Sequence, residues 1–88
     1  MKVKLFGGLR KTAGSSQVEG SGVTIREVLE HICIQNEPLR KSIFDGRELH
    51  PHVRVILNGH DSELLQGLET PVSKDDQIAI FPPIAGGI

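Results

Sequence analysis

The chain has 88 residues, of which 38% are hydrophobic and 24% are charged, and its 10 basic and 11 acidic side chains give a formal net charge of -1. A chain of this length forms a single domain around one compact core, and its charge balance gives no electrostatic reason to expect nucleic acid or a membrane as a partner. The one cysteine excludes an intramolecular disulfide and a thiolate-rich zinc site, and it favours a reducing, cytoplasmic location.

Two short strands are predicted before the first helix. Residues 2–6 alternate polar and apolar side chains and end at Gly7-Gly8, a pattern typical of a half-buried strand that leads into a turn. Gly7-Gly8 lacks the Lys-Ser/Thr ending of a phosphate-binding loop, so we expect it to form a hairpin turn. A second short strand is predicted at Gln17–Glu19, where it would pair with the first.

An amphipathic helix is predicted to begin at Thr24. Thr24 and Glu27 form a capping box, in which the hydroxyl and the carboxylate each accept a hydrogen bond from a free N–H group of the first turn. The apolar residues that follow at helical spacing are Ile25, Val28, Leu29 and Ile32. We expect the helix to end near residue 35 or 36, because Pro38 disfavours helical backbone just before it. Cys33 lies on the apolar side, so a small buried side chain is favoured over a nucleophile.

The second half of the chain predicts a long loop and then three strands. Residues 53–59 are a β-branched run that ends at Asn58-Gly59, a pair typical of a type I′ hairpin turn because both positions need positive φ. Residues 60–63 are expected to pair back briefly, and residues 64–76 to be loop with one helical turn. Residues 77–81 are a near-continuous apolar strand, of the kind that is buried on both faces in the centre of a sheet.

This order of elements predicts an α+β fold, the ubiquitin-like β-grasp. A mixed sheet of four to five strands would pack on one main helix, with the first and last strands as parallel neighbours in its centre. We expect residues 1–83 to form the β-grasp domain and residues 84–88 to form a flexible C-terminal tail.

The predicted last strand is followed at once by a proline pair. Proline has no backbone N–H group to donate and favours an extended conformation, so the chain must leave the sheet there. A strand this hydrophobic that runs into another aliphatic residue without a charge predicts an apolar surface for a partner. The residues expected to bind the partner are Phe81, Pro82, Pro83 and Ile84.

The next residues, Ala85, Gly86 and Gly87, are suited to a narrow passage. Glycine has no side chain, so this segment can enter a partner's active site that admits no Cβ atom. C-terminal glycines are often frayed ends without a role, but their position directly after a β-grasp strand favours the functional interpretation.

The sequence resembles the MoaD/ThiS family of sulfur carriers, which includes the small subunit of molybdopterin synthase. The resemblance covers essentially the whole chain, through "MKVKLFGGLRKTAG", "VRVILNG" and "GLETPVSKDDQIAIFPPIAGG", and it is most specific in residues 81–87. The segment "ELHPHVRVILNG" further resembles longer members, including those linked to cysteine synthesis. The pathway therefore stays open among molybdopterin, cysteine and thiamine synthesis and tRNA thiolation.

The resemblance implies that the protein is a substrate of other enzymes and not an enzyme itself. A ubiquitin-activating-type enzyme would adenylate the carboxylate of Gly87 with ATP, and a persulfide protein would donate the sulfur that converts it to a thiocarboxylate. A sulfur-accepting synthase or large subunit would then take the sulfur. No metal or cofactor is expected on this chain, because the partner uses the ATP. The alternatives are a ubiquitin-like modifier conjugated to lysines of target proteins, and a plain interaction domain.

Ile88 departs from the family pattern, because active members usually end at the second glycine. Gly87 cannot be adenylated while its carbonyl group is in a peptide bond. One hypothesis is that a peptidase removes Ile88. The others are that Ile88 is tolerated, that it was added with the expression sequence, or that the chain has lost the chemistry.

Two other groups of residues are interpreted as structural and not as metal-binding or catalytic sites. His50-Pro51-His52 places two of the four histidines at alternate positions, but no third ligand is evident nearby, so solvated loop histidines are favoured over a metal site. Asp75-Asp76 resembles the acidic turn that precedes the last strand in many β-grasp proteins, and we interpret it as turn chemistry.

Overall fold

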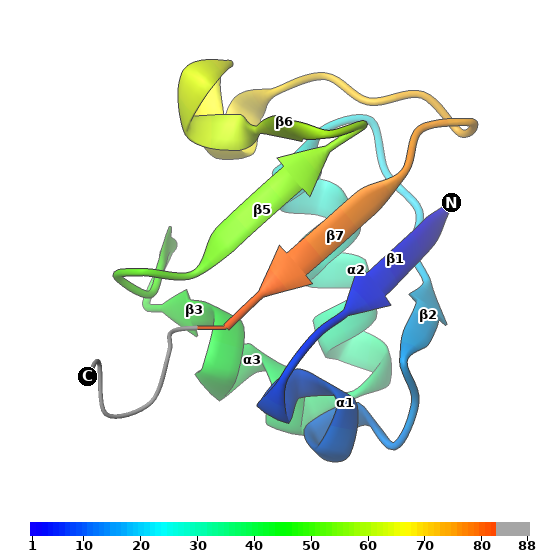
Figure 1. Ribbon diagram of the computed structural model, residues 1–88, viewed down its shortest axis with the longest axis vertical. Coiled ribbons are helices and arrows are strands. Elements are labelled where there is room, and N and C mark those ends of the chain that lie inside the picture. The colour runs from blue at the N-terminus through cyan, green and yellow to red at the C-terminus, as the bar shows by residue number, and fades with distance from the viewer. Residues whose placement is uncertain (83–88) are drawn as a thin grey trace.

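The computed structural model describes residues 1–82, and it consists of a sheet with helices packed on one face (Figure 1). The helices and strands in chain order are β1 (Lys2–Leu5), α1 (Gly8–Ala13), β2 (Gln17–Glu19), α2 (Ile25–Gln35), α3 (Glu37–Ile43), β3 (Phe44–Asp45), β4 (Glu48–Leu49), β5 (Arg54–Leu57), β6 (His60–Asp61), the 3-10 helices η1 (Ser62–Leu64) and η2 (Gly67–Glu69), and β7 (Ile78–Phe81). Residues 83–88 lie outside this description, so the predicted flexible tail and the boundary after residue 83 stay predictions.

The main sheet has five strands in the order β2-β1-β7-β5-β6, and β3 and β4 form a separate two-stranded hairpin. β1 and β7 are parallel neighbours in the centre, with Val3 opposite Ile78 and Leu5 opposite Ile80. β5 lies antiparallel on the other side of β7. This mixed sheet, with α2 across its back, confirms the ubiquitin-like β-grasp (Figure 1).

The prediction that residues 77–81 are buried on both faces is wrong. Ile78 and Ile80 are buried against the helices, whereas Ala79 is half-buried and Phe81 is exposed. The helices cover only one face of this sheet, so even its central strand alternates between a buried and an open side. Burial under the helices therefore does not explain the apolar residues on the open side.

The start and the end of α2 agree with the sequence prediction. The Thr24 hydroxyl accepts a hydrogen bond from the Glu27 N–H group (3.2 Å), and the Glu27 carboxylate accepts one from the N–H group of Val23 (3.1 Å). The reciprocal cap thus reaches one residue further back than the standard capping box, but it satisfies the same kind of free donor. The buried residues of this helix are Ile25, Val28, Leu29, Ile32 and Cys33.

Two sequence predictions about helices were wrong. Gly7-Gly8 does not form a hairpin turn, because α1 separates β1 from β2. The sequence does hold a signal for the end of α1: Gly14 adopts the left-handed conformation typical of a residue just after a helix. The long loop after residue 36 is also absent: α3 and the β3-β4 hairpin lie there. Pro38 ends α2, yet it sits in the first turn of α3, where a missing N–H group is tolerated.

The Asn58-Gly59 turn joins β5 to β6 as predicted, with φ values of 50° and 84°. The Asn58 side chain also ties the turn to the start of β7, because its amide donates to the Asp76 carboxylate (3.0 Å) and its oxygen accepts from the Gln77 N–H group (2.8 Å). The other Asp76 oxygen accepts from the Ser73 N–H group (2.7 Å). The turn role predicted for this acidic pair is confirmed for Asp76.

These hydrogen bonds should make stability depend on pH through Asp76. The Ser73 N–H group and then the Asn58 amide lower the pKa of Asp76 below its ordinary value of 3.8, so ionised Asp76 stabilises the fold above that pH. That contribution is lost as pH falls through the lower, folded-state pKa. In urea denaturation from neutral pH to about pH 2, Asp76→Asn should be less stable than the parent at neutral pH and should converge with it in acid. Asp75→Asn is the control, and an Asp76→Asn deficit that stays constant with pH would contradict this account.

The single thiol should be unreactive in the folded protein. Cys33 has no exposed surface, and burial raises the pKa of its thiol from 9.0 to about 11, although the Arg40 guanidinium acts in the opposite direction. The shift of two units lowers the thiolate fraction at neutral pH about 100-fold. Alkylation by a maleimide should therefore be slow in buffer and fast in denaturant. Equal rates in the two conditions would show that the helix opens more readily than its packing implies.

Within residues 1–82, none of the helices has the length and hydrophobicity that crossing a membrane would need.

Candidate partner-binding face

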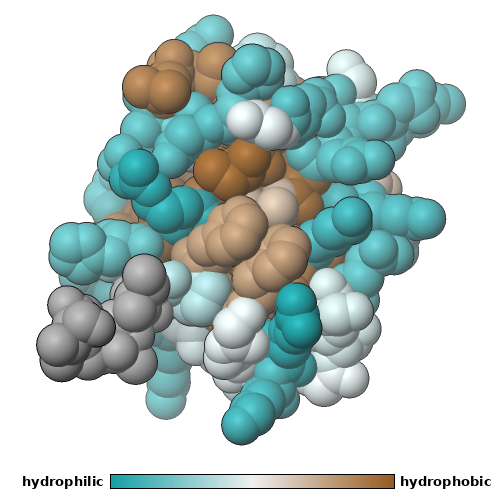
Figure 2. Space-filling view, viewed as in Figure 1, coloured by the Kyte–Doolittle hydropathy of each residue, from teal (hydrophilic) through white to brown (hydrophobic). Residues whose placement is uncertain are grey.

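The open face of the sheet carries an apolar patch, defined here as Phe6, Ile56, Ala79 and Phe81. Ala79 lies opposite Ile56 on β5, and Phe81 lies one position further along the same side of β7. Figure 2 shows this apolar area over the centre of the sheet, with hydrophilic residues around it. An apolar area surrounded by polar residues on an otherwise solvated face is typical of a protein interaction site.

The centre of the patch is a stack of two aromatic rings. The centroids of Phe6 and Phe81 are 4.4 Å apart, and the rings are 7° from parallel. The Arg10 guanidinium lies over the Phe6 ring, 5.4 Å from its centroid, and its Nε–H group donates to the Leu5 carbonyl (3.1 Å). Phe81 nevertheless stays 38% exposed, so the stack orients its ring without burying it.

The charged residues around the patch differ from one side to the other. On the β5 side, Arg54 forms ion pairs with Asp61 (3.0 Å) and Glu63 (2.9 Å), so the two carboxylates outweigh its charge. On the β1 side, Lys2, Lys4 and Arg10 form no ion pair with any residue of the described part of the chain. The β1 side of the patch is therefore positive, and the β5 side is not.

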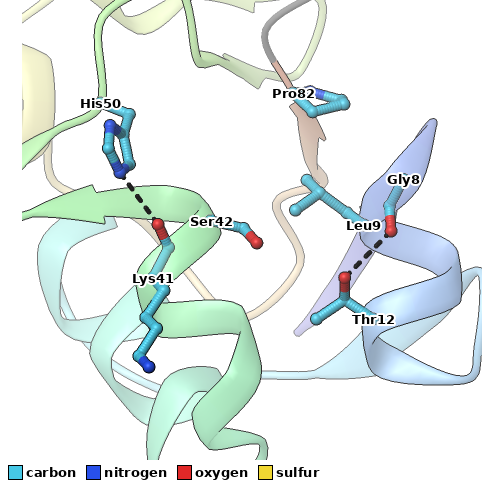
Figure 3. A pocket seen from close by; sticks show the side chains of 7 residues that line it. All are labelled: Gly8, Leu9, Thr12, Lys41, Ser42, His50 and Pro82. Carbon is cyan, nitrogen blue, oxygen red and sulfur yellow. Dashed lines mark hydrogen bonds between the residues drawn. The ribbon is translucent and has the colours of Figure 1, made fainter. Parts of the chain in front are cut away.

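Pro82 lies where the chain leaves the sheet, at the edge of a hollow of about 330 Å³. One wall comes from α1 (Gly8, Leu9 and Thr12), and the other from the end of α3 and from His50, whose Nε2–H group donates to the Lys41 carbonyl (2.9 Å) (Figure 3). Pro82 thus lies beside α1 and the end of α3, where the sequence predicts a turn and a loop.

The structure brings two of the predicted site residues together, because Phe81 and Pro82 are consecutive at the end of β7. The other predicted residues lie outside the described ones: Pro83, Ile84, Ala85, Gly86, Gly87 and Ile88. Sequence reasoning missed Phe6, Arg10 and Ile56. A signal for Phe6 was present, since it continues the polar side of an alternating strand after Lys2 and Lys4.

Among residues 1–82, no group of three or more His, Cys, Asp or Glu side chains lies together as a metal site would need. His50 and His52 lie in the segment between β4 and β5, where the first makes the hydrogen bond to Lys41 described above.

A model of the ThiS family matches residues 3–87 of the chain. The chain belongs to the ThiS family. Small archaeal modifier protein 1 of Haloferax volcanii is 31% identical over 91 residues, which cover 99% of this chain and 100% of the relative. A protein of Archaeoglobus fulgidus that is named as a sulfur carrier is 27% identical over 88 residues, with 99% and 98% covered.

The fold of this ThiS-family chain is also found among solved structures. A chain in the crystal structure of the BexX/CysO complex of Amycolatopsis orientalis superposes with a TM-score of 0.88 at 28% identity, over 98% of both chains. The relatives named above are a sulfur carrier and a small modifier protein.

Proposed function

We propose that this ThiS-family chain is a sulfur carrier whose Gly87 carboxylate is adenylated and then converted to a thiocarboxylate. One observation carries the proposal: two residues of the apolar patch, Ala79 and Phe81, lie on the strand that leads, through Pro82, into the Gly86-Gly87 segment. A partner that docks on the patch would find Gly87 five residues beyond Pro82 along the chain.

The chemistry needs no acid or base from this chain. A carboxylate oxygen of Gly87 attacks the α-phosphorus of ATP, and pyrophosphate leaves. The sulfur of a persulfide protein then attacks the acyl carbon, displaces AMP and forms an acyl disulfide. A thiol reduces that disulfide, which leaves sulfur in place of one carboxylate oxygen and converts the donor to a disulfide. The adenylating enzyme lowers the activation barriers of these steps. The carrier contributes the docking face and a C-terminal segment without bulky side chains.

The patch fits an adenylating enzyme of the ubiquitin-activating type as its first partner. Burying Phe81 and Ile56 against an apolar surface would supply part of the affinity. Lys4 and Arg10, which form no ion pair within residues 1–82, would favour acidic residues on the side of the partner that faces β1. The sulfur-accepting synthase would use the same face afterwards, because both partners must hold the same end of the chain.

Adenylation further requires that Ile88 is removed, because the Gly87 carbonyl group is otherwise part of a peptide bond. We propose that a peptidase exposes this carboxylate.

ATP–pyrophosphate exchange tests the proposed activation. The chain ending at Gly87 is mixed with the ubiquitin-activating-type enzyme of the same organism, ATP and labelled pyrophosphate. We expect label to enter ATP only when the carrier is present. An enzyme that exchanges with an established carrier but not with this chain would overturn the proposal.

A second function is favoured by the 31% identity to a small archaeal modifier protein. The same activated glycine would acylate lysines of target proteins in place of accepting sulfur. Mass spectrometry of tryptic peptides from the host would separate the two functions: trypsin cuts this chain last after Lys74, so lysines that carry residues 75–87 as a branch would support the modifier.

A further inference from the structure

We propose that Gly7 positions the end of the chain, because only a residue without a side chain lets Pro82 pack beside the start of α1. The proposal rests on the proposed function for its consequence, but the contact itself belongs to the described fold. Gly7 would be a positioning residue, since it acts through Pro82 and not on the reacting carboxylate.

The pairing of β1 with β7 brings the two residues together. Lys4 lies opposite Ala79 and Leu5 opposite Ile80, and the Phe6 N–H group donates to the Ile80 carbonyl (3.2 Å). One position further, the Phe6 and Phe81 rings stack, and the next position places Gly7 beside Pro82. At this position the chain passes from β1 into α1, and it leaves the sheet at the end of β7.

The space at this point is too small for a side chain. A Cβ atom on Gly7 would lie 2.8 Å from Cγ and 3.4 Å from Cδ of Pro82, and the first distance is far below van der Waals contact. Gly7 also has φ 58° and ψ -139°, a conformation that residues with a Cβ atom rarely adopt. An alanine here must therefore displace the proline ring or the start of α1.

Hydrogen bonds hold the backbone around Gly7, so we expect an added side chain there to displace Pro82 and not the start of α1. The Gly7 carbonyl accepts from the Arg10 N–H group (3.2 Å), and the Phe6 carbonyl accepts from the Leu9 N–H group (3.2 Å). Arg10 is held in turn by its bond to the Leu5 carbonyl. Pro82 has no N–H group to hold it, so a clash should turn the chain after residue 81 away from its present direction.

Gly14 supplies a matched control at the other end of α1. It has a positive φ of 75°, but a Cβ atom added there would meet nothing within 4 Å. Gly14→Ala thus tests an alanine at positive φ without the contact to Pro82, although the left-handed conformation of Gly14 strains a Cβ atom less than the conformation of Gly7 does. Pro82→Ala removes the Cγ and Cδ atoms that the new methyl group would meet.

Exchange kinetics on chains ending at Gly87 test the inference. Because a displacement of about 1 Å can cost about 100-fold in rate, Gly7→Ala should lower kcat for pyrophosphate exchange by about that factor. The KM for the carrier should stay near the parent value, because the apolar patch is kept. Gly14→Ala should exchange like the parent. The Gly7→Ala/Pro82→Ala double variant should be no slower than Pro82→Ala alone, a non-additivity that a merely structural role of Gly7 would not produce.

Residual dipolar couplings of the Phe81 N–H bond and the Pro82 Cα–Hα bond give a readout that needs no enzyme. They should change in Gly7→Ala, stay at parent values in Gly14→Ala, and show no further change when Gly7→Ala is added to Pro82→Ala.

Equal kcat and equal couplings in Gly7→Ala and Gly14→Ala would overturn the inference while the parent still exchanges. A parent that does not exchange would instead overturn the proposed function, and the couplings would still decide the role of Gly7. If Gly7→Ala does not fold, Pro82→Ala alone must change both kcat and the couplings, or the inference fails.

Discussion

Pyrophosphate exchange should be absent with the 88-residue chain and present once Ile88 is deleted. In the 88-residue chain the carbonyl group of Gly87 is part of an amide, and the terminal carboxylate belongs to Ile88. The isoleucine side chain adds bulk at the point where the partner must close around the end of the chain. The two chains, at equal concentration with the same enzyme and no peptidase, give the comparison, and intact mass before and after the reaction shows that Ile88 was not lost.

The glycine itself can be tested within the shorter chain. Gly87→Ala adds one methyl group and removes easy access to positive φ, so exchange should fall about 100-fold while urea denaturation is unchanged. Exchange by the 88-residue chain at the rate of the shorter one, with its mass unchanged, would contradict the assignment of Gly87 as the reacting residue.

Phe81→Asp should weaken binding to the adenylating enzyme about 100-fold. Losing the burial of an aromatic side chain costs about 1.5–3 kcal/mol, and a carboxylate buried without a partner adds to that. The loss of stability should be much smaller, because Phe81 is 38% exposed and stacks on Phe6 outside the buried core. Isothermal titration with the enzyme and urea denaturation of the free carrier measure the two effects separately.

Ile34→Asp is the matched control for this substitution. Ile34 is 68% exposed on α2, on the helical side of the molecule, so the same change in charge and hydrophobicity falls away from the patch. Its affinity should equal that of the parent. If Phe81→Asp binds normally or unfolds the protein, the docking face lies elsewhere or the ring belongs to the core.

The parts of the fold that were predictable are those with local and redundant signals. The α2 helix has a capping box, an apolar stripe and a proline just beyond its end, and the β5-β6 hairpin has the Asn58-Gly59 pair. α1 and α3 were missed because their signals had a second meaning. Gly7-Gly8 suits a hairpin turn as well as a helix start, and Pro38 ends one helix while it begins the next.

The candidate site was only partly predictable for a different reason. Phe81 could be named from the apolar strand and the residues that follow it. Its stacking on Phe6 depends on the parallel register of β1 and β7, which lie at opposite ends of the sequence. The contact of Gly7 with Pro82 depends on the same register, so no local pattern could indicate it.

Intact mass spectrometry after the complete reaction tests the central claim most directly. The chain ending at Gly87 is incubated with the adenylating enzyme, ATP, a persulfide donor and a thiol. Our account predicts that its mass rises by the difference between one sulfur and one oxygen atom, and that fragmentation places the change on Gly87. An unchanged mass, under conditions in which an established carrier of the family gains sulfur, or a sulfur located on any other residue, would contradict it.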